Sequence, residues 1–187
     1  MRVIAGTAKG RRLFSPDWDG LRPTSDRLRG TLFDVVGAAV EGARVLDGCA
    51  GTGAIGIEAL SRGADHVLFI ERDPRAVALI RRNVAHCGLT DRCIIRRAGV
   101  PTALRRPPVH PFDLILLDPP YGAQDIGEIL TAAAGHLGPH GLLVLEQARR
   151  DAPREDPALT ALRVVRAGAS VLALYGPSDT RATEGAE

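Results

Sequence analysis

The sequence predicts an α/β domain built on a mainly parallel sheet of seven strands, and three observations support this prediction. From residue 43 onward, short apolar runs of strand length alternate with segments whose apolar residues recur at helical spacing. A glycine-rich turn joins the first of these strands to the helix that follows it. Two strand-like runs near the C-terminus are joined by Ala167-Gly168-Ala169, which favours a closing antiparallel hairpin. Short apolar strands separated by helices are typical of a parallel sheet with both faces covered.

The first 23 residues predict a short basic arm followed by a loop. Residues 2–13 alternate loosely and include Lys9-Gly10-Arg11-Arg12, which suggests an extended or hairpin arm. Residues 1–29 carry seven basic and three acidic side chains, a net charge of +4 against −2 for the remainder. Clustered Lys and Arg favour phosphate binding through counterion release, although a solvated arm would have the same composition. The candidate phosphate contacts are Lys9, Arg11, Arg12 and Arg22.

The remaining elements follow in order along the chain. The first helix is expected to begin where either Thr24 or Ser25 can cap it, and its apolar face recurs at helical spacing. That face consists of Leu28, Leu32, Phe33, Val36 and Val40. Strands are expected at residues 44–47, 66–70, 92–97, 112–117, 141–146, 162–166 and 170–175. Helices are expected at residues 54–62, 74–86 and 125–136, with a short one near Thr102.

We expect one domain, divided into an arm and loop at residues 1–23, a catalytic core at residues 24–175 and a flexible polar tail at residues 176–187. No apolar stretch reaches the roughly 18 to 20 residues that a membrane-spanning helix needs. The first residues carry charge and have no apolar signal-peptide core, so the protein is expected to stay where it is made.

The cysteines and histidines argue against secretion and against a metal site. The three cysteines, Cys49, Cys87 and Cys93, form no CxxC pair and are odd in number, which indicates free thiols in the reducing cytoplasm. His136 and His140 have the spacing of two metal ligands on one helix turn. A Gly-Pro pair between them would break that helix, so we expect no metal.

A glycine loop follows the first predicted strand. Residues 45–56 read VLDGCAGTGAIG, so Gly51, Gly53 and Gly56 match G-x-G-x-x-G, and Glu71 follows the next predicted strand. Taken alone, this pattern is typical of dinucleotide sites, in which the glycines let the backbone approach a pyrophosphate and the acid holds ribose hydroxyls. A nicotinamide-dependent dehydrogenase is therefore one interpretation, and a glycine-rich turn without any ligand is another.

The residues before the first glycine favour a different ligand. Asp47 and three small residues separate the strand from Gly51, whereas the dinucleotide motif normally runs almost directly from strand into glycine. S-adenosylmethionine carries an ammonium and a sulfonium and no phosphate, so a nearby carboxylate and close backbone approach suit its methionine end. Glu71 would then accept both ribose hydroxyls. The cofactor-binding candidates are Asp47, Ala50, Gly51, Gly53, Glu71 and Arg72.

The motif that decides the chemistry is Asp-Pro-Pro-Tyr at residues 118–121, directly after an apolar strand. The exocyclic amine of a nucleobase is a poor nucleophile, because its lone pair is delocalised into the ring. The Asp118 carboxylate and the Pro119 carbonyl can each accept one N–H hydrogen bond and thereby aim the lone pair at a methyl group. Tyr121 offers an aromatic face on which an extruded base can stack, and its replacement by Phe should be nearly silent if the ring face does the holding. The alternative is that two prolines merely end a buried strand.

These motifs resemble those of class I methyltransferases that act on amino groups, whose hallmark is [DNS]-P-P-[YFW] after the fourth strand. The chain is similar to the bacterial 16S rRNA guanine-N2 methyltransferase D family in Ile4-Ala5-Gly6, Lys9-Gly10, Arg22-Pro23-Thr24, residues 47–53, Glu71 and residues 118–121. The resemblance implies a Rossmann-like class I methyltransferase fold. It also implies metal-free methylation of N2 of one 16S rRNA guanine, guanine 966 in the family, within an assembling small ribosomal subunit.

One position departs from the family pattern. Relatives usually carry an acid after the third strand that contacts the adenine amine of the donor, whereas this chain has Arg97-Ala98-Gly99. We therefore expect the backbone near Ala98 and Gly99 to recognise adenine, with a lower affinity for the donor. The oligomeric state is not encoded in these motifs, and we expect a monomer.

Three other functions remain open. A DNA adenine or cytosine methyltransferase would share residues 118–121 but generally adds a domain that reads base edges, for which this chain leaves no length. A protein-glutamine methyltransferase would more typically carry Asn at position 118. A catalytically silent RNA-binding factor would keep the basic arm but would not need Asp118.

Overall fold

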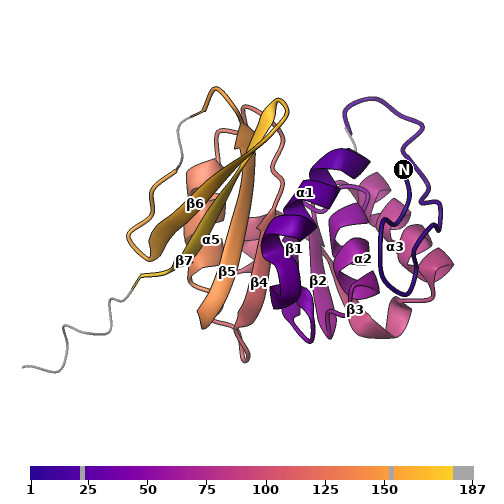
Figure 1. Cartoon of the computed structure of the whole chain (residues 1–187), viewed down its shortest axis with the longest axis horizontal. Helices are drawn as coiled ribbons and strands as arrows, with labels where there is room; N and C mark the ends of the chain where they lie inside the picture. Colours follow the sequence, from indigo (N-terminus) through magenta and orange to yellow (C-terminus); the bar gives the residue numbers. More distant parts are fainter. Residues whose placement is uncertain (22–23, 152–153, 179–187) are drawn as a thin grey trace, which may run out of the picture.

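The computed structural model describes residues 1–21, 24–151 and 154–178, which contain one seven-stranded sheet (Figure 1). The strands are β1 (Arg44–Gly48), β2 (His66–Glu71), β3 (Cys93–Arg97), β4 (Phe112–Leu117), β5 (Leu137–Ala148), β6 (Leu159–Ala167) and β7 (Ser170–Pro177). Their order is β3-β2-β1-β4-β5-β7-β6. β1 to β5 are parallel, and β7 runs antiparallel to both of its neighbours. The predicted mainly parallel sheet with a closing hairpin is confirmed.

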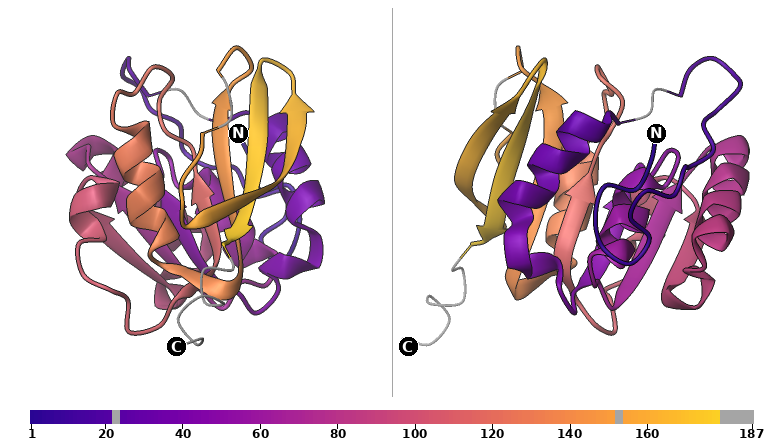
Figure 2. Two further views of the ribbon diagram at one scale, coloured as in Figure 1. Left: turned by 90° about the vertical axis from the view of Figure 1, so that its left-hand side faces the viewer. Right: turned by 45° about the vertical axis from the view of Figure 1, so that its right-hand side comes forward.

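Helices cover both faces of this sheet (Figure 2). They are α1 (Asp26–Val36), α2 (Ala54–Ser61), α3 (Pro74–Cys87), α4 (Val100–Ala103) and α5 (Ile126–Ala134), with short 3-10 turns η1 (Gly37–Val40) and η2 (Thr90–Arg92). Side chains of α1, α2 and α3 belong to one buried cluster, and side chains of α4 and α5 belong to a second cluster on the opposite face. The sheet therefore lies between two layers of helices, as its apolar strands require.

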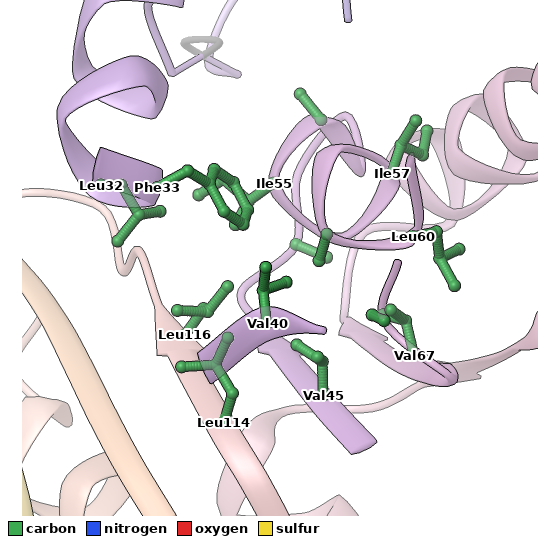
Figure 3. Close-up of a cluster of buried hydrophobic side chains, with 14 of the residues drawn as sticks. Leu32, Phe33, Val40, Val45, Ile55, Ile57, Leu60, Val67, Leu114 and Leu116 are labelled. Atoms are coloured by element: carbon green, nitrogen blue, oxygen red, sulfur yellow. The ribbon is translucent and has the colours of Figure 1, made fainter. Parts of the chain in front are cut away.

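Successive side chains of the central strands belong alternately to the two clusters. Val45 of β1 and Leu114 of β4 belong to the first cluster, whereas Leu46 and Ile115 belong to the second. Figure 3 shows the first cluster, in which side chains of α1 and α2 meet those of β1, β2 and β4. Because strand side chains alternate with a period of two, an unbroken apolar run fills both clusters.

The N-terminal arm packs along α2 as part of the fold. The N–H groups of Ile4 and Ala5 donate to the buried carboxylate of Glu58 at 2.7 and 2.9 Å, and the N–H of Ala8 donates to Ser61 Oγ at 2.9 Å. The two ends of the arm form an antiparallel bridge, in agreement with the hairpin prediction. Three apolar side chains of the arm belong to the first cluster, so the arm contributes to the core.

One basic residue counted with the arm lies inside the protein. Arg29 of α1 is fully buried, and its guanidinium donates to the carbonyl oxygens of Arg2 and Thr24 and to the carboxylate of Asp26. Burial lowers the pKa of Arg29, and the neighbouring Asp26 counteracts this effect. A buried and paired guanidinium does not meet a phosphate, so the sequence-derived charge of +4 overstates the positive charge that the arm exposes.

Several boundaries differ from the expected ones. Ser25 rather than Thr24 caps α1, and its hydroxyl accepts an N–H of the first helical turn. The helix ends early because Gly37 takes a φ of +57°, so Val40 lies on η1, where it is still buried. β5 begins at Leu137 rather than at residue 141, because its first residues pair with β4 ahead of a shift in register. Pairing between strands, which local sequence does not show, decides that last boundary.

Within the described residues, no helix is both long and apolar enough to cross a membrane. The ring nitrogens of His136 lie 3.0 and 2.9 Å from the carbonyl oxygens of Ala132 and Arg106, so both nitrogens already contact backbone groups. His140 is exposed. Arg22, a candidate phosphate contact, and residues 179–187 of the expected tail lie outside the described residues.

Candidate functional site

A cavity of about 590 Å³ lies at the carboxyl ends of the central strands. Its walls come from the residues that end or follow β1 to β5, from the start of α1 and from the turn between β6 and β7. That turn and the start of α1 lie at the same edge of the sheet in Figure 1. Nine of the predicted site residues line the cavity: Ala50, Gly51, Glu71, Arg72, Ala98, Gly99, Asp118, Pro119 and Tyr121.

The glycine loop between β1 and α2 takes a conformation that depends on its glycines. Gly51 and Gly53 have φ values of +55° and +76°, which few other residues adopt without strain. A Cβ atom on Gly56 would lie 2.3 Å from the ring of Phe69 and 2.9 Å from the carboxylate of Asp47. The first two glycines therefore shape the turn, and the third lets α2 approach the sheet. Gly53 itself is not on the cavity wall.

Asp47 lies beneath this loop and not on the cavity wall. Its side chain is buried, Oδ2 accepts the Gly56 N–H at 2.8 Å, and Oδ1 has no hydrogen-bond partner in the structure. Burial raises the pKa of Asp47 to about 8, and the nearby Glu71 adds to this rise, whereas the hydrogen bond from Gly56 opposes it. Asp47, a predicted cofactor-binding residue, therefore lies behind the loop that lines the cavity. Asp47 instead ties β1 to the first turn of α2.

Replacing Asp47 by Asn is expected to change how the free energy of unfolding depends on pH. The pKa of this carboxyl rises from 3.8 to about 8 on folding, so the folded protein binds the proton more tightly, and wild-type stability falls as the pH rises between these values. Asn still accepts the Gly56 N–H but does not titrate. The free energy of unfolding, measured with urea at about pH 5 and about pH 8, should fall less between these pH values for the variant than for the wild type. An equal fall in the free energy of unfolding for both proteins would contradict a raised pKa of Asp47.

Glu71, at the end of β2, fastens the glycine loop. Its Oε2 accepts the Gly51 N–H at 2.8 Å, and its Oε1 accepts the N–H groups of Arg72 and Asp73 at 2.7 and 2.9 Å. A carboxylate has about four lone-pair positions, so three backbone donors leave little capacity for two ribose hydroxyls at once. A ligand that binds both oxygens would share them with, or displace, the Gly51 N–H.

The residues after β3 form the next part of the wall. The N–H of Ala98 donates to the carbonyl of Glu71 at 3.0 Å, so this expected contact to adenine is already engaged in the sheet. Gly99 and Val100 follow at the start of α4 and line the cavity. A Cβ atom on Gly99 would meet no atom within 4 Å, so the Gly99 backbone is not crowded on that side.

The Asp-Pro-Pro-Tyr loop places Asp118 beside two residues that sequence reasoning missed. The Thr24 hydroxyl donates a hydrogen bond to Asp118 Oδ2, and the carboxyl group of Glu146, near the end of β5, forms a hydrogen bond with Asp118. Burial raises the pKa of Asp118 well above its ordinary value, and Glu146 adds to this rise. Asp118 directly follows a predicted strand, and Glu146 is the last residue of another. This shared position at the carboxyl end of a strand was the signal in the sequence that could have identified Glu146 as a site residue.

Tyr121 is held by its hydroxyl group. The hydroxyl donates to Glu146 Oε1 at 2.9 Å and lies 2.7 Å from Ser170 Oγ, which itself donates to the same Glu146 oxygen at 2.8 Å. The residue is nevertheless 44% exposed and lines the cavity, so part of it remains accessible to a ligand. The hydroxyl of Tyr121 is therefore anchored to two neighbouring side chains. Ser170, on the hairpin strand β7, was not predicted from the sequence.

The cavity is acidic. Among the described residues that line it, five are carboxylates and two are arginines: Glu71, Asp73, Asp118, Asp125 and Glu146, with Arg27 and Arg72. The thiol of Cys49 responds to this environment: burial raises its pKa to about 12, and Glu71, Asp118, Asp47 and Asp125 contribute. A negative field of this kind favours a cationic ligand and disfavours a pyrophosphate.

The basic residues of the arm lie away from this cavity. Arg11 donates to a backbone carbonyl at the end of α3, and Lys9 is on the turn that contacts the end of α2. Both helices begin at the carboxyl edge of the sheet, so their ends lie toward the opposite edge. Lys9, Arg11 and Arg12 are exposed. At the cavity itself, Arg27 and Arg72 supply the positive charge.

The similarity to known proteins extends over nearly the whole chain. A family model described as conserved hypothetical protein 95 matches residues 1–176. "Putative rRNA methyltransferase YlbH" of Bacillus subtilis (strain 168) is 34% identical over 94% of this chain and 98% of its own length. "Ribosomal RNA small subunit methyltransferase D" of Haemophilus influenzae is 37% identical over 65% of this chain and 64% of its own length. A solved structure, "Putative methyltransferase yhhF from Escherichia coli", matches with a TM-score of 0.83 and 29% identity over 95% of this chain and 98% of that chain.

Proposed function

Because this chain belongs to the ribosomal RNA small subunit methyltransferase D family, we propose that it methylates the exocyclic N2 amine of a guanine in 16S rRNA. Its fold is that of a class I methyltransferase, and its methyl donor is S-adenosylmethionine. The observation that carries the proposal is the Asp-Pro-Pro-Tyr loop, which lines the same acidic cavity as the glycine loop. We further propose a cytoplasmic monomer that acts on the small ribosomal subunit or its assembly intermediate.

The charge of the cavity fits this donor. When bound, S-adenosylmethionine supplies an electrophilic methyl group on a positively charged sulfur. Five carboxylates against two arginines on the cavity wall suit its sulfonium and ammonium groups, whereas the two phosphates of a nicotinamide dinucleotide would enter an unfavourable field. The residues proposed to hold the donor are Ala50, Gly51, Glu71, Arg72, Ala98 and Gly99, and Asp47 and Gly53 shape the loop from behind.

Asp118 and Pro119 are proposed to prepare the amine for attack. The Asp118 carboxylate accepts one N2–H and the Pro119 carbonyl accepts the other, which localises the nitrogen lone pair and directs it toward the methyl group. The bond from N2 to the methyl carbon forms as the bond from that carbon to sulfur breaks, and the sulfur keeps the electron pair. The N2 proton then passes to Asp118. A raised carboxyl pKa suits this step, because the carboxylate holds the proton more firmly.

Tyr121 is proposed to stack on the extruded base. Its ring is partly open to the cavity, and its hydroxyl is anchored to Glu146 and Ser170. An anchored aromatic ring loses little freedom when a base stacks on it, and such stacking is worth roughly 1 to 3 kcal/mol per base. The position of the ring next to Asp118 supports a role in holding the target base rather than the donor.

The proposal is tested by the product. The purified protein is incubated with labelled S-adenosylmethionine and small-subunit particles that lack the modification, and the rRNA is digested to nucleosides. N2-methylguanosine is the expected product. N6-methyladenosine, or label in glutamine of a ribosomal protein, would show a different amino-methyltransferase. Titration calorimetry with the donor and with NAD provides the second measurement, and tight binding of NAD alone would restore the dehydrogenase interpretation.

The arm residues Lys9, Arg11 and Arg12 are proposed to contact RNA at a distance from the reacting guanine. Replacing all three by Ala is expected to weaken particle binding and to flatten its salt dependence, because each lost phosphate contact lowers the slope by about one. Donor affinity should be unchanged, since these side chains lie away from the cavity. Binding is measured at several salt concentrations. Unchanged affinity and slope would identify the arm as a solvated surface.

A further inference from the structure

Asp118 and Glu146 occupy neighbouring positions at the carboxyl edge of the sheet. β4 and β5 are parallel neighbours, and Leu117 at the end of β4 pairs with Leu145, so the residue after each of these leucines is an acid that lines the cavity. Glu146 is buried to 7% exposure and lines the cavity. The two groups are close enough for Glu146 to raise the pKa of Asp118. Two adjacent carboxylates are more than the amine of a target base requires.

Glu146 is held in one orientation by neighbouring hydroxyl groups. Tyr121 and Ser170 both donate to its Oε1, at 2.9 and 2.8 Å. Both of these donors use Oε1, and a further side-chain hydrogen bond links Glu146 to Asp118. Tyr121 and Ser170 therefore hold the Glu146 carboxyl group in one orientation, and a base that binds here would take the place of its contact with Asp118.

Nucleobases differ in the group that lies beside their exocyclic amine. In guanine the ring nitrogen N1 next to the N2 amine carries a hydrogen and donates. In adenine the ring nitrogen N1 next to the N6 amine accepts, and in cytosine N3 accepts beside the N4 amine. A second carboxylate beside the amine therefore pairs with guanine, whereas it would face a lone pair on adenine or cytosine. A site that leaves buried acceptors unpaired discriminates strongly against the wrong ligand.

We propose that Glu146 is the residue that selects guanine, by accepting its N1–H while Asp118 and Pro119 hold its N2 amine. This inference rests on the proposed function and adds the reason for the choice of base. Three donors of the guanine edge then meet three acceptors that come from the ends of two neighbouring strands. Tyr121 contributes in two ways, since its ring stacks on the base and its hydroxyl orients Glu146.

The test replaces the target guanine by 2-aminopurine, which keeps the amine at C2 but has no hydrogen on N1. Small-subunit particles are reconstituted with rRNA that carries either base at the modified position, and kcat/KM for methyl transfer is measured for each. The wild-type protein is expected to prefer guanine by at least about tenfold, the range of one specific base contact. For Glu146→Gln, whose amide can donate to an unprotonated N1, the preference should fall to within about threefold.

Two variants separate base selection from positioning. Tyr121→Phe removes one hydrogen bond to Glu146 but keeps the carboxylate, so its methyl transfer should slow while the preference for guanine over 2-aminopurine stays at the wild-type value. Glu128→Gln makes the same chemical change at an exposed position of α5 and should leave both rate and preference unchanged. Urea unfolding of each variant establishes that it is folded.

The outcomes distinguish this inference from the proposed function. If the wild-type product is not N2-methylguanosine, the proposed function fails, and the selection of guanine fails with it. If N2-methylguanosine forms but the wild-type protein methylates 2-aminopurine equally well, only the role of Glu146 is overturned. The same holds if folded Glu146→Gln keeps the full preference for guanine. A loss of preference in Tyr121→Phe equal to that in Glu146→Gln would overturn the assignment to the Glu146 carboxylate, because this variant keeps that carboxylate.

Discussion

Replacing Asp118 by Ala is expected to lower kcat for methyl transfer by on the order of a hundredfold or more, while donor affinity stays within a few fold. The reason is that positive charge develops on the amine nitrogen only as the new bond forms. Asp118 interacts with that charge in the transition state, and Thr24 and Glu146 fix its carboxyl group beforehand. An interaction that strengthens in the transition state affects kcat more than it affects binding.

The measurement is single-turnover transfer of labelled methyl to small-subunit particles, with donor affinity determined for each variant. Asp118→Asn is the matched control, because Asn keeps an oxygen that accepts an N–H but carries no charge and cannot take the proton. Its rate should lie between those of the wild type and Asp118→Ala. Near-normal transfer by folded Asp118→Ala would end the proposed mechanism.

Replacing Gly6 by Ala is expected to destabilise the fold far more than the same change at Gly10. Both residues have positive φ, +78° and +83°, so both substitutions carry similar backbone strain. A Cβ atom on Gly6 would lie 1.7 Å from the carbonyl oxygen of Ser61, whereas one on Gly10 would meet nothing within 4 Å. We expect Gly10→Ala to cost about 1 to 2 kcal/mol from strain, and Gly6→Ala to cost more than about 3 kcal/mol because α2 must shift.

Urea unfolding of the two variants checks this comparison, since the only intended difference between them is the contact with α2. Donor affinity is the second readout. The arm packs on the same helix that the glycine loop begins, so Gly6→Ala should also weaken donor binding, whereas Gly10→Ala should leave it unchanged. If the two substitutions cost the same free energy, the arm does not depend on close packing against Ser61.

Several residues that line the cavity could be predicted, because they end or follow strands. Parallel strands bring their carboxyl ends to one edge of a sheet, so Gly51, Glu71 and Asp118 could be assigned to a common site from local sequence alone. The alternation of apolar strands and amphipathic helices likewise predicted the order of the elements. These features depend on short segments of chain, and the structure confirms their arrangement.

The partners of these residues could not be predicted in the same way. Thr24 and Asp118 are 94 positions apart, and Tyr121 and Ser170 are 49 apart, so their hydrogen bonds exist only because the start of α1 and the returning hairpin meet the same strand ends. Glu146 stands beside Asp118 because of the register between β4 and β5, which sequence periodicity does not specify.

The sequence by itself determined the class of fold and singled out the two loops proposed to bind the donor and to carry the chemistry, since each is encoded in a few consecutive residues. Only the tertiary structure decided which charges are exposed and which are buried. In the sequence, Arg29 counted as one of the basic charges near the N-terminus, but it is fully buried. Asp47 was predicted to bind the cofactor, and it lies beneath the glycine loop rather than on the cavity wall. Whether an ionisable side chain meets solvent, a ligand or another part of the chain depends on which distant segments pack over it, and that packing is a property of the whole fold.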